Sequence, residues 1–288
     1  MNEVLRSMLE SYAPDDRVNT IHALREIIQE IALLGLWRGK FFEHGAFYGG
    51  TALRILYGLN RFSEDLDFSL LLPDDSFDLQ PYLNAVEREL LAFGFHVRTE
   101  IKEKGTDASI QSAFVKANTL ESLLVISAAE TVIGTTHADK LLKIKIEIDT
   151  DPPSDFGVES KYLLKPIPFA VRAYSLPDLF AGKMHAILCR KWKNRVKGRD
   201  WYDLVWFLAH HPRLHLAHLE QRMRQSGHYR QEAPLTDKSL LTLLHSAIEQ
   251  LNINQAKQDV LPFVKDPHAT DVWSSDFFIS ILTRLKAE

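Results

Sequence analysis

The sequence contains a single cysteine, Cys189, among 288 residues. One cysteine excludes a disulfide within the chain and any thiolate metal cluster, which is consistent with a reducing compartment. The chain also lacks a run of the roughly 20 apolar residues that cross a bilayer, and its N-terminal residues have no apolar core of signal-peptide length. We therefore expect a cytoplasmic protein without a membrane segment.

A large excess of charge of either sign is likewise absent. The 34 basic and 38 acidic side chains leave a net charge of −4 at pH 7, so any binding of nucleic acid must depend on a local basic patch. With 45% hydrophobic and 25% charged residues, the composition is that of an ordinary globular protein with an ample core. The length allows one large domain or two closely associated ones.

Two adjacent glycines follow an apolar and aromatic run at residues 41–48, which predicts a strand. Gly49 and Gly50 allow the backbone to turn tightly, and Thr51 then begins a short helical pattern that it can cap. The N–H groups at the start of such a helix bind anions such as phosphate. The pattern therefore predicts a phosphate-binding turn.

A second strand is predicted just beyond this turn, because polar and apolar residues alternate at residues 63–68. Asp65 and Asp67 then point to the same face of the strand. Adjacent carboxylates repel each other unless a cation lies between them, and oxygen ligands suit Mg²⁺. A phosphate-binding turn beside such acids is what phosphoryl or nucleotidyl transfer needs. The alternative interpretation is a surface strand with solvated acids.

Residues 140–150 also alternate, and the isoleucines at positions 144, 146 and 148 define one face. Lys145, Glu147 and Asp149 share the opposite face, so this strand can bring a third carboxylate to the pair of aspartates. Taken alone, the pattern favours an amphipathic edge strand whose exposed side chains form salt bridges.

A helix is predicted from Ser175, with Pro177 in its first turn. Lys183 and Arg190 lie two turns apart on one side of this helix, with Lys183 at the margin of the apolar stripe. From Lys183 to Arg199 the chain contains seven basic residues and no acidic one. We interpret this segment as a landing site for nucleic-acid phosphates; the alternative is a basic loop without function.

Asp200 and Asp203 begin the next predicted helix, three residues apart, so both can face the same way. Farther along, His211 and His215 have a spacing that is seen in helical zinc sites. Pro212 interrupts the helical register between them, and this disfavours a metal site there.

Four motifs along the chain resemble those of the AbiEii/AbiGii toxin family. This family is a branch of the polymerase-β-like nucleotidyltransferases and includes the mycobacterial MenT toxins. The motifs are Gly-Gly-Thr-Ala-Leu-Arg at 49–54 with Arg-x-Ser-x-Asp-Leu-Asp-Phe at 61–68, a Lys-hydrophobic-acid strand at 145–147, Lys-x-x-Ala-x-x-x-Arg at 183–190, and Arg-Asp-x-x-Asp-Leu at 199–204.

The prolines within residues 151–155 predict a domain boundary there. The resemblance implies an α/β fold with a polymerase-β-like mixed sheet that carries the acids, which we expect in residues 1–155. A mainly helical domain in residues 156–288 is expected to close the active-site cleft. The implied function is that of a metal-dependent nucleotidyltransferase, with Mg²⁺ or Mn²⁺ as cofactor, which acts as the toxin of a type IV toxin–antitoxin or abortive-infection system. Relatives transfer nucleotides from a nucleoside triphosphate to the 3′ end of tRNA and thereby block translation. The expected partners are therefore a nucleoside triphosphate, a tRNA acceptor and a cognate antitoxin.

The resemblance also assigns roles to individual residues. The expected catalytic residues are Asp65, Asp67, Glu147, Lys183 and Asp203, of which Asp65, Asp67 and Glu147 bind the metal ion. The expected contacts to nucleotide or phosphate are Gly49, Gly50, Thr51, Arg54, Ser63, Lys145 and Arg190. The expected contacts to nucleic acid are Lys191, Lys193, Arg195, Lys197 and Arg199. Asp149 is the alternative to Glu147, and Asp200 is the alternative to Asp203.

Other functions fit the same acids. A small-molecule nucleotidyltransferase of the antibiotic-modifying kind uses them but does not need the basic segment. A nucleotide-binding protein that has lost activity keeps the phosphate-binding turn. A protein kinase-like transferase fits less well, because the chain has no His-Arg-Asp element.

Overall fold

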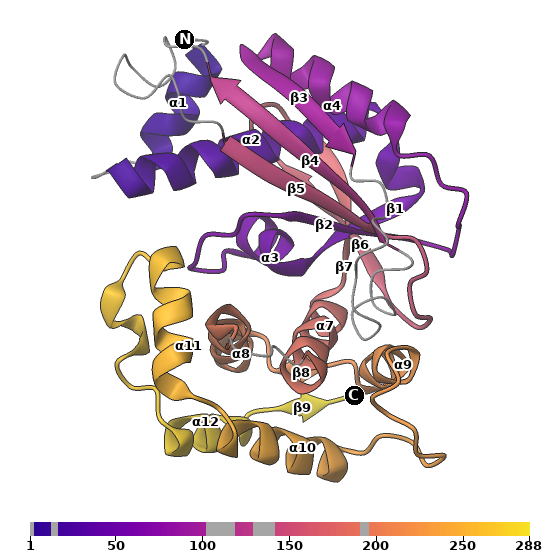
Figure 1. Cartoon of the computed structure of the whole chain (residues 1–288), viewed down its shortest axis with the longest axis vertical. Helices are drawn as coiled ribbons and strands as arrows, with labels where there is room; N and C mark the ends of the chain where they lie inside the picture. Colours follow the sequence, from indigo (N-terminus) through magenta and orange to yellow (C-terminus); the bar gives the residue numbers. More distant parts are fainter. Residues whose placement is uncertain (1–2, 13–16, 102–118, 129–141, 191–195) are drawn as a thin grey trace. The chain divides into compact units, whose positions relative to one another are not determined.

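The computed structural model of the chain describes residues 3–12, 17–101, 119–128, 142–190 and 196–288 (Figure 1). A strand predicted near residues 110–117 lies outside these ranges, as do three of the predicted nucleic-acid contacts, Lys191, Lys193 and Arg195.

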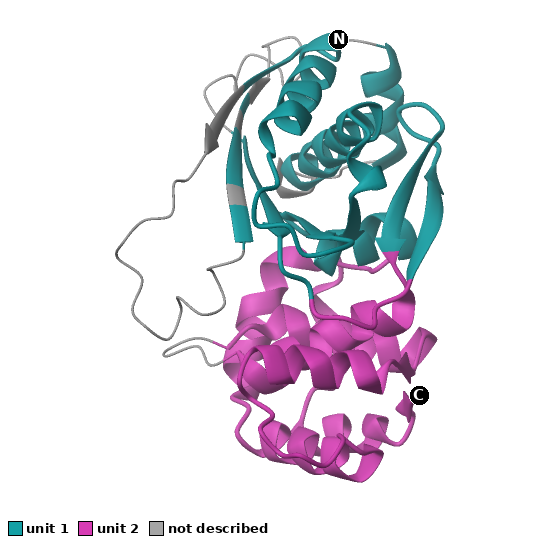
Figure 2. Cartoon of the chain, turned by 90° about the vertical axis from the view of Figure 1, so that its right-hand side faces the viewer, with its two compact units in different colours: residues 1–58, 62–152, 158–173 teal, residues 59–61, 153–157, 174–288 magenta. Residues whose placement is uncertain are grey.

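The chain forms two compact units (Figure 2). The first unit comprises residues 1–58, 62–152 and 158–173, and the second comprises residues 59–61, 153–157 and 174–288. The sequence predicts one boundary at residue 155, whereas the structure assigns residues 158–173 to the first unit. The reason is that these residues form strands of the first unit's sheet.

Among the described residues, seven strands form one mixed sheet in the order β3-β4-β5-β2-β1-β7-β6 (Figure 1). The strands are β1 (Gly45–Tyr48), β2 (Leu66–Leu70), β3 (Phe95–Ile101), β4 (Thr119–Ala128), β5 (Leu142–Asp149), β6 (Val158–Leu163) and β7 (Phe169–Tyr174). Strand β2 pairs antiparallel with β1 and parallel with β5. The two strands that carry the predicted acids are therefore neighbours.

Both of these strands are amphipathic, as their alternating residues predict. Leu66 and Phe68 on β2 are fully buried, and so are the three alternating isoleucines of β5. Each such side chain contributes about 1.5–3 kcal/mol when it leaves water. A slip of one residue in register would expose all of them, so the burial of one face fixes which residues occupy the other.

The segment that follows β5 differs from its prediction. The sequence predicts one strand or extended connector over residues 162–173, whereas the structure has two strands, β6 and β7, with Pro166 and Pro168 between them. Proline has no N–H to donate to a sheet, so the two prolines separate the strands. Strand β7 pairs in parallel with β1, which joins this segment to the first unit.

The described helices of the first unit are α1 (Glu3–Tyr12), α2 (Arg17–Arg38), α3 (Gly49–Tyr57) and α4 (Gln80–Ala92), with a 3-10 helix η1 (Phe41–Glu43). The sequence predicts that α2 ends near Gly35 or Gly39, but it continues to Arg38. A Cβ atom on Gly35 would lie 2.7 Å from the Cα atom of Val86 on α4, so this glycine permits close helix packing instead of ending the helix. None of the helices in the described ranges is long and apolar enough to cross a membrane.

The second unit is mostly helical. Its described elements are α7 (Leu176–Cys189), α8 (Gly198–His210), β8 (Arg213–Leu214), α9 (Leu216–Gln225), α10 (Asp237–Glu249), α11 (Ile253–Val260), η2 (Leu261–Phe263), η3 (Pro267–Thr270), α12 (Ser275–Leu282) and β9 (Lys286–Ala287). Helices α7 and α8 pack through the stacked rings of Phe180 and Phe207, whose centroids are 4.3 Å apart.

A buried carboxylate fixes the start of α7. Ser175 occupies the predicted N-cap position, but its hydroxyl donates to the side chain of Asp178 at 2.5 Å. The same carboxylate accepts the Gly157 N–H at 2.9 Å and lies 2.6 Å from the Nδ1 atom of His215. His215 is one of the two histidines whose spacing resembles a zinc site, and its Nδ1 atom interacts with Asp178.

Candidate active site

The start of α3 brings the backbone against the carboxylate of Asp67. Gly49 has a φ angle of +82°, which disfavours residues with a side chain, and a Cβ atom there would lie 2.3 Å from Asp67 Oδ2. The turn thus needs glycine for two separate reasons. The strand before it is shorter than predicted, because residues 41–43 form the 3-10 helix η1 and β1 begins at Gly45.

Thr51 has a different role from the predicted one. Tyr48 occupies the N-cap position of α3, so Thr51 lies within the first turn of the helix. Its side chain is fully buried, and its hydroxyl donates a hydrogen bond to the backbone carbonyl of Asp65. Thr51 therefore ties the helix start to the segment that carries the acids.

Two of the three predicted metal ligands lie on paired strands, and the third, Asp65, immediately precedes one of these strands. Asp67 on β2 is directly opposite Glu147 on β5 in the parallel pairing. The predicted strand over residues 63–68 begins only at Leu66, so Asp67 lies on β2 on the face opposite the buried Leu66 and Phe68, whereas Asp65 lies in the segment that leads into the strand. Both aspartates are partly exposed. The arrangement can present carboxylate oxygens to a cation beside the start of α3.

The alternative third acid, Asp149, lies farther along the strand. It is opposite Ser69, and its Oδ1 atom accepts the N–H of Asp151 at 3.1 Å. Glu147 is the residue opposite Asp67, and it forms a salt bridge with Lys145 on its own strand. The register thus favours Glu147 as the third ligand.

Substitution of Gly49 and of Gly58 by alanine tests how closely the backbone at Gly49 approaches Asp67. Gly58 also has a positive φ angle, +76°, but no atom lies within 4 Å of a Cβ placed there. We expect Gly58→Ala to lower the free energy of unfolding by about 1 kcal/mol through backbone strain alone. Gly49→Ala adds the clash with Asp67 and should cost at least about 1 kcal/mol more. Urea unfolding of both variants measures the difference, and equal losses would contradict the close approach.

The segment before β2 is anchored by α2. The side-chain amide of Gln29 donates to the backbone carbonyls of Ser63 and Glu64 at 3.2 and 3.0 Å. Arg54, a predicted phosphate contact, binds Glu26 at 2.8 Å and lies over the ring of Phe62. Gln29 is a positioning residue that the sequence does not reveal, because nothing in a helical pattern distinguishes it from a solvated glutamine.

The second unit contains a buried network of charges around Asp203. Both oxygens of this carboxylate accept hydrogen bonds of 2.6 Å from the guanidinium of Arg61. The ammonium of Lys183 lies 2.7 Å from Asp203 and 3.2 Å from Asp200. Asp203 is fully buried, and the side chain of Lys183 is only 13% exposed.

This network shows the surroundings of two predicted catalytic residues, Lys183 and Asp203. The sequence places Lys183 at the margin of an apolar stripe, where its loss would cost little stability, but the structure holds it between two carboxylates. Asp203 contacts Arg61 and Lys183, and its predicted catalytic role stays a prediction. Its partner Arg61 lies 142 residues earlier in the chain, a separation that no local spacing reveals.

The basic neighbours of Asp200 perturb its ionisation. Burial opposes the charged form, but the positive charges of Lys183 and other basic residues lower the pKa of Asp200 to about 2. These other residues are Lys197 and Arg190. Burial in turn lowers the pKa of Lys197, while the charge of Asp200 raises it.

The low pKa of Asp200 makes stability depend on pH. An aspartate has an ordinary pKa of about 3.9, so the ionised form stabilises the folded state above that pH, and this contribution disappears as the pH falls through about 2. We expect Asp200→Asn to lower the free energy of unfolding by about 2 kcal/mol at pH 6, with a difference from the wild type that shrinks from pH 4 to pH 2. Urea titrations at several pH values measure it. A difference that is constant with pH would contradict the assignment.

The two described members of the predicted nucleic-acid segment already have partners in the second unit. Lys197 interacts with Asp200, and the guanidinium of Arg199 lies 4.1 Å from the ring centroid of Phe263. Arg190, at the C-terminal end of α7, is exposed. The contacts predicted for Lys191, Lys193 and Arg195 stay predictions, since those residues lie outside the described ranges.

One compact group of potential metal ligands occurs in the part of the chain that the structure describes. It consists of His185, Cys189 and His228, whose ligand atoms lie within 4.8 Å of one another. Asp67 and Glu147 are neighbours in register, but together with Asp65 they do not form so compact a group. The sequence does not reveal the histidine–cysteine group, because His228 is far from His185 and Cys189 along the chain and no local spacing links them.

Comparisons with known proteins identify similar families and folds. A family model described as "Nucleotidyl transferase AbiEii toxin, Type IV TA system" matches residues 31–279. No curated protein matches the chain. Among solved structures, JHP933 from Helicobacter pylori is similar with a TM-score of 0.53 and 17% identity, over 91% of this chain and 88% of that one. A second H. pylori structure, titled as a candidate nucleotidyltransferase, has a TM-score of 0.51 and 17% identity, over 88% of this chain and 89% of that one. The predicted α/β fold with a nucleotidyltransferase-like mixed sheet is thereby confirmed.

Proposed function

Because this chain belongs to the AbiEii family of nucleotidyl transferase toxins of type IV toxin–antitoxin systems, we propose that it transfers nucleotides from a nucleoside triphosphate to the 3′ end of tRNA. The observation that carries the proposal is the position of Asp67, opposite Glu147 and against the glycine that starts α3. This position combines carboxylates with the helix start that suits a phosphate. Extension of the tRNA 3′ end would block translation, and the family implies an antitoxin as partner.

The donor set suits a hard divalent cation. Asp65, Asp67 and Glu147 offer only carboxylate oxygens, which Mg²⁺ and Mn²⁺ prefer. We assign these residues to hold the cation. When bound, it would neutralise charge on the triphosphate and polarise the phosphoryl group that is attacked.

The residues of the chain supply the remaining steps. Backbone N–H groups at the start of α3 would bind phosphate oxygens of the triphosphate. Glu147 would accept the proton of the attacking 3′ hydroxyl, whose oxygen bonds to the α-phosphorus. The bond from the α-phosphorus to the bridging oxygen then breaks, and pyrophosphate leaves with that oxygen.

Incubation of the protein with each labelled nucleoside triphosphate and total tRNA tests this proposal. We expect label to enter tRNA from at least one nucleotide, and EDTA to abolish the transfer. A parallel reaction with aminoglycosides as acceptors serves as the control for antibiotic modification. Label in the antibiotic but not in the tRNA would favour the small-molecule function, and label in neither would contradict nucleotidyl transfer to both.

The basic segment provides a separate test of RNA as the acceptor. Because Lys197 and Arg199 contact other residues of the second unit, the variant should replace only Lys191, Lys193 and Arg195 by glutamine. Each phosphate contact on a single strand contributes about 0.7 to the slope of log affinity against log salt concentration, so the loss of three should reduce the slope by about 2. Affinity for the nucleoside triphosphate should not change. An unchanged slope for tRNA would exclude these residues as contacts.

A further inference from the structure

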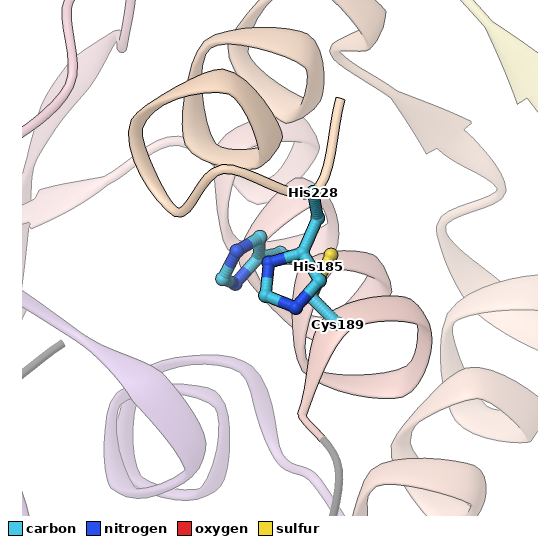
Figure 3. Close-up of side chains that lie close together, drawn as sticks. All are labelled: His185, Cys189 and His228. Atoms are coloured by element: carbon cyan, nitrogen blue, oxygen red, sulfur yellow. The ribbon is translucent and has the colours of Figure 1, made fainter. Parts of the chain in front are cut away.

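The histidine–cysteine group in the second unit lies where two segments meet. His185 and Cys189 are four residues apart on α7 and share one face of that helix. His228 comes from the segment that follows α9 and lies beside them (Figure 3). One ring nitrogen from each histidine and the Cys189 sulfur lie within 4.8 Å of one another.

These separations are close to those of a metal site. In a tetrahedral zinc site with Zn–N bonds near 2.0–2.1 Å and Zn–S bonds near 2.3 Å, the ligand atoms are about 3.3–3.6 Å apart. The longest separation in the group therefore needs to shorten by up to about 1.5 Å to reach that geometry. His228 is exposed, so its ring has room to move, whereas Cys189 is buried and fixed on the helix.

The hydroxyl of Ser226 shows that the two histidines face a common point. Its Oγ atom lies 2.9 Å from His185 Nε2 and 3.0 Å from His228 Nδ1. It also bonds to Cys189 and donates to the carbonyl of Met223 at 3.2 Å. A hydroxyl has one proton and two lone pairs, so it cannot satisfy four partners at once. A cation at this point would be bound by the ring nitrogens and the sulfur in place of their hydrogen bonds to Ser226. The hydroxyl of Ser226 would then keep only its hydrogen bond to the carbonyl of Met223.

We propose that His185, Cys189 and His228 bind a thiophilic transition metal of the zinc class, which links the last turn of α7 to the segment after α9. One thiolate and two imidazoles suit zinc and copper(I), not magnesium. Arg190 and Arg222 add positive charge near His185, and this charge repels a cation. The affinity for the metal must therefore come from its bonds to the ligands, above all the bond to the Cys189 sulfur. Three protein ligands leave a fourth position for water. The site draws only on residues of the second unit, and this proposal does not rest on the proposed function.

Cobalt(II) tests the site directly, because its spectrum reports the ligands. The full-length protein with Asp65→Asn and Asp67→Asn, which removes the carboxylate site, is stripped of metal and titrated with CoCl₂. We expect one cobalt per chain, a thiolate-to-cobalt charge-transfer band in the near ultraviolet, the intense visible bands of a tetrahedral ion, and loss of all of them on addition of zinc. Excess Mg²⁺ should not compete.

Single substitutions identify the ligands. Cys189→Ser should remove the charge-transfer band. His228→Ala changes an exposed residue and should keep the fold by circular dichroism, while cobalt affinity falls by about 100-fold, since loss of even an outer partner costs 10- to 100-fold. His245→Ala, which replaces another exposed histidine of the second unit, is the matched control and should bind as the parent does. Absence of a charge-transfer band in the parent, or undiminished affinity in folded His228→Ala, would overturn the proposal.

Discussion

Replacement of Asp65 or Asp67 by asparagine should reduce nucleotidyl transfer by about 10³-fold, while the folded state persists. Loss of one charged ligand removes several kcal/mol of charge stabilisation from the reaction, and about 4 kcal/mol corresponds to three orders of magnitude in rate. Stability should change little or rise, because both aspartates are partly exposed and the loss of one negative charge lessens the repulsion between nearby carboxylates. The measurement is the rate of incorporation of labelled nucleotide into tRNA at saturating Mg²⁺.

Asp149→Asn is the matched control for this experiment. Asp149 lies on the same face of β5 as Glu147, but it is opposite Ser69, and asparagine keeps an oxygen that can accept the Asp151 N–H. We expect this variant to retain activity within about tenfold, which corresponds to less than 1.4 kcal/mol. A loss as large in Asp149→Asn as in Asp67→Asn would assign the third ligand to Asp149 instead of Glu147. Full activity in either aspartate variant would contradict the metal site itself.

Asp203→Asn should destabilise the protein by about 3–5 kcal/mol, which is the usual cost of removing one partner from a buried ion pair. The substitution removes the charge of the carboxylate that accepts two hydrogen bonds from the guanidinium of Arg61, whose side chain is only 3% exposed. It also removes the nearer of the two carboxylates of Lys183. Urea unfolding can be followed by the fluorescence of Trp201 and Trp206, both buried in α8.

An exposed ion pair in the same unit provides the comparison. The side chains of Arg213 and Glu288 are 68% and 52% exposed and form a salt bridge of 3.3 Å. Arg213→Ala should cost less than about 1 kcal/mol, because water screens such a pair. The double variant Arg61→Met with Asp203→Asn should be more stable than the sum of the single effects predicts. A cost for Asp203→Asn no larger than that for Arg213→Ala would show that the buried network contributes little.

The features that the sequence predicts correctly depend on local periodicity. Alternation of apolar residues in β2 and β5 is sufficient to place Asp67 and Glu147 on the polar faces of their strands, because burial of the other face allows no other register. The start of α7 is also predictable, since proline in the first turn restricts where a helix begins.

The features that the sequence does not predict depend on contacts between distant segments. Gly35 resembles a helix terminator, and only the proximity of Val86 reveals that it serves packing. Thr51 resembles an N-cap, but its hydroxyl bonds to a carbonyl beyond the helix. The partnership of Arg61 with Asp203 and the approach of His228 to Cys189 both require the tertiary structure, because neither pair is linked by a local pattern.

The passage of residues 59–61 into the second unit has a consequence for how the chain folds during synthesis. Arg61 leaves the ribosome well before Asp203, since 142 residues separate them. The second unit therefore cannot complete its charge network from its own contiguous sequence, and a fragment that starts at Tyr174 would lack the buried guanidinium. Neither unit corresponds to a continuous segment of the chain. Because residues 59–61 are synthesised long before the rest of the second unit, the ion pair between Arg61 and Asp203 can form only after residue 203 has been translated.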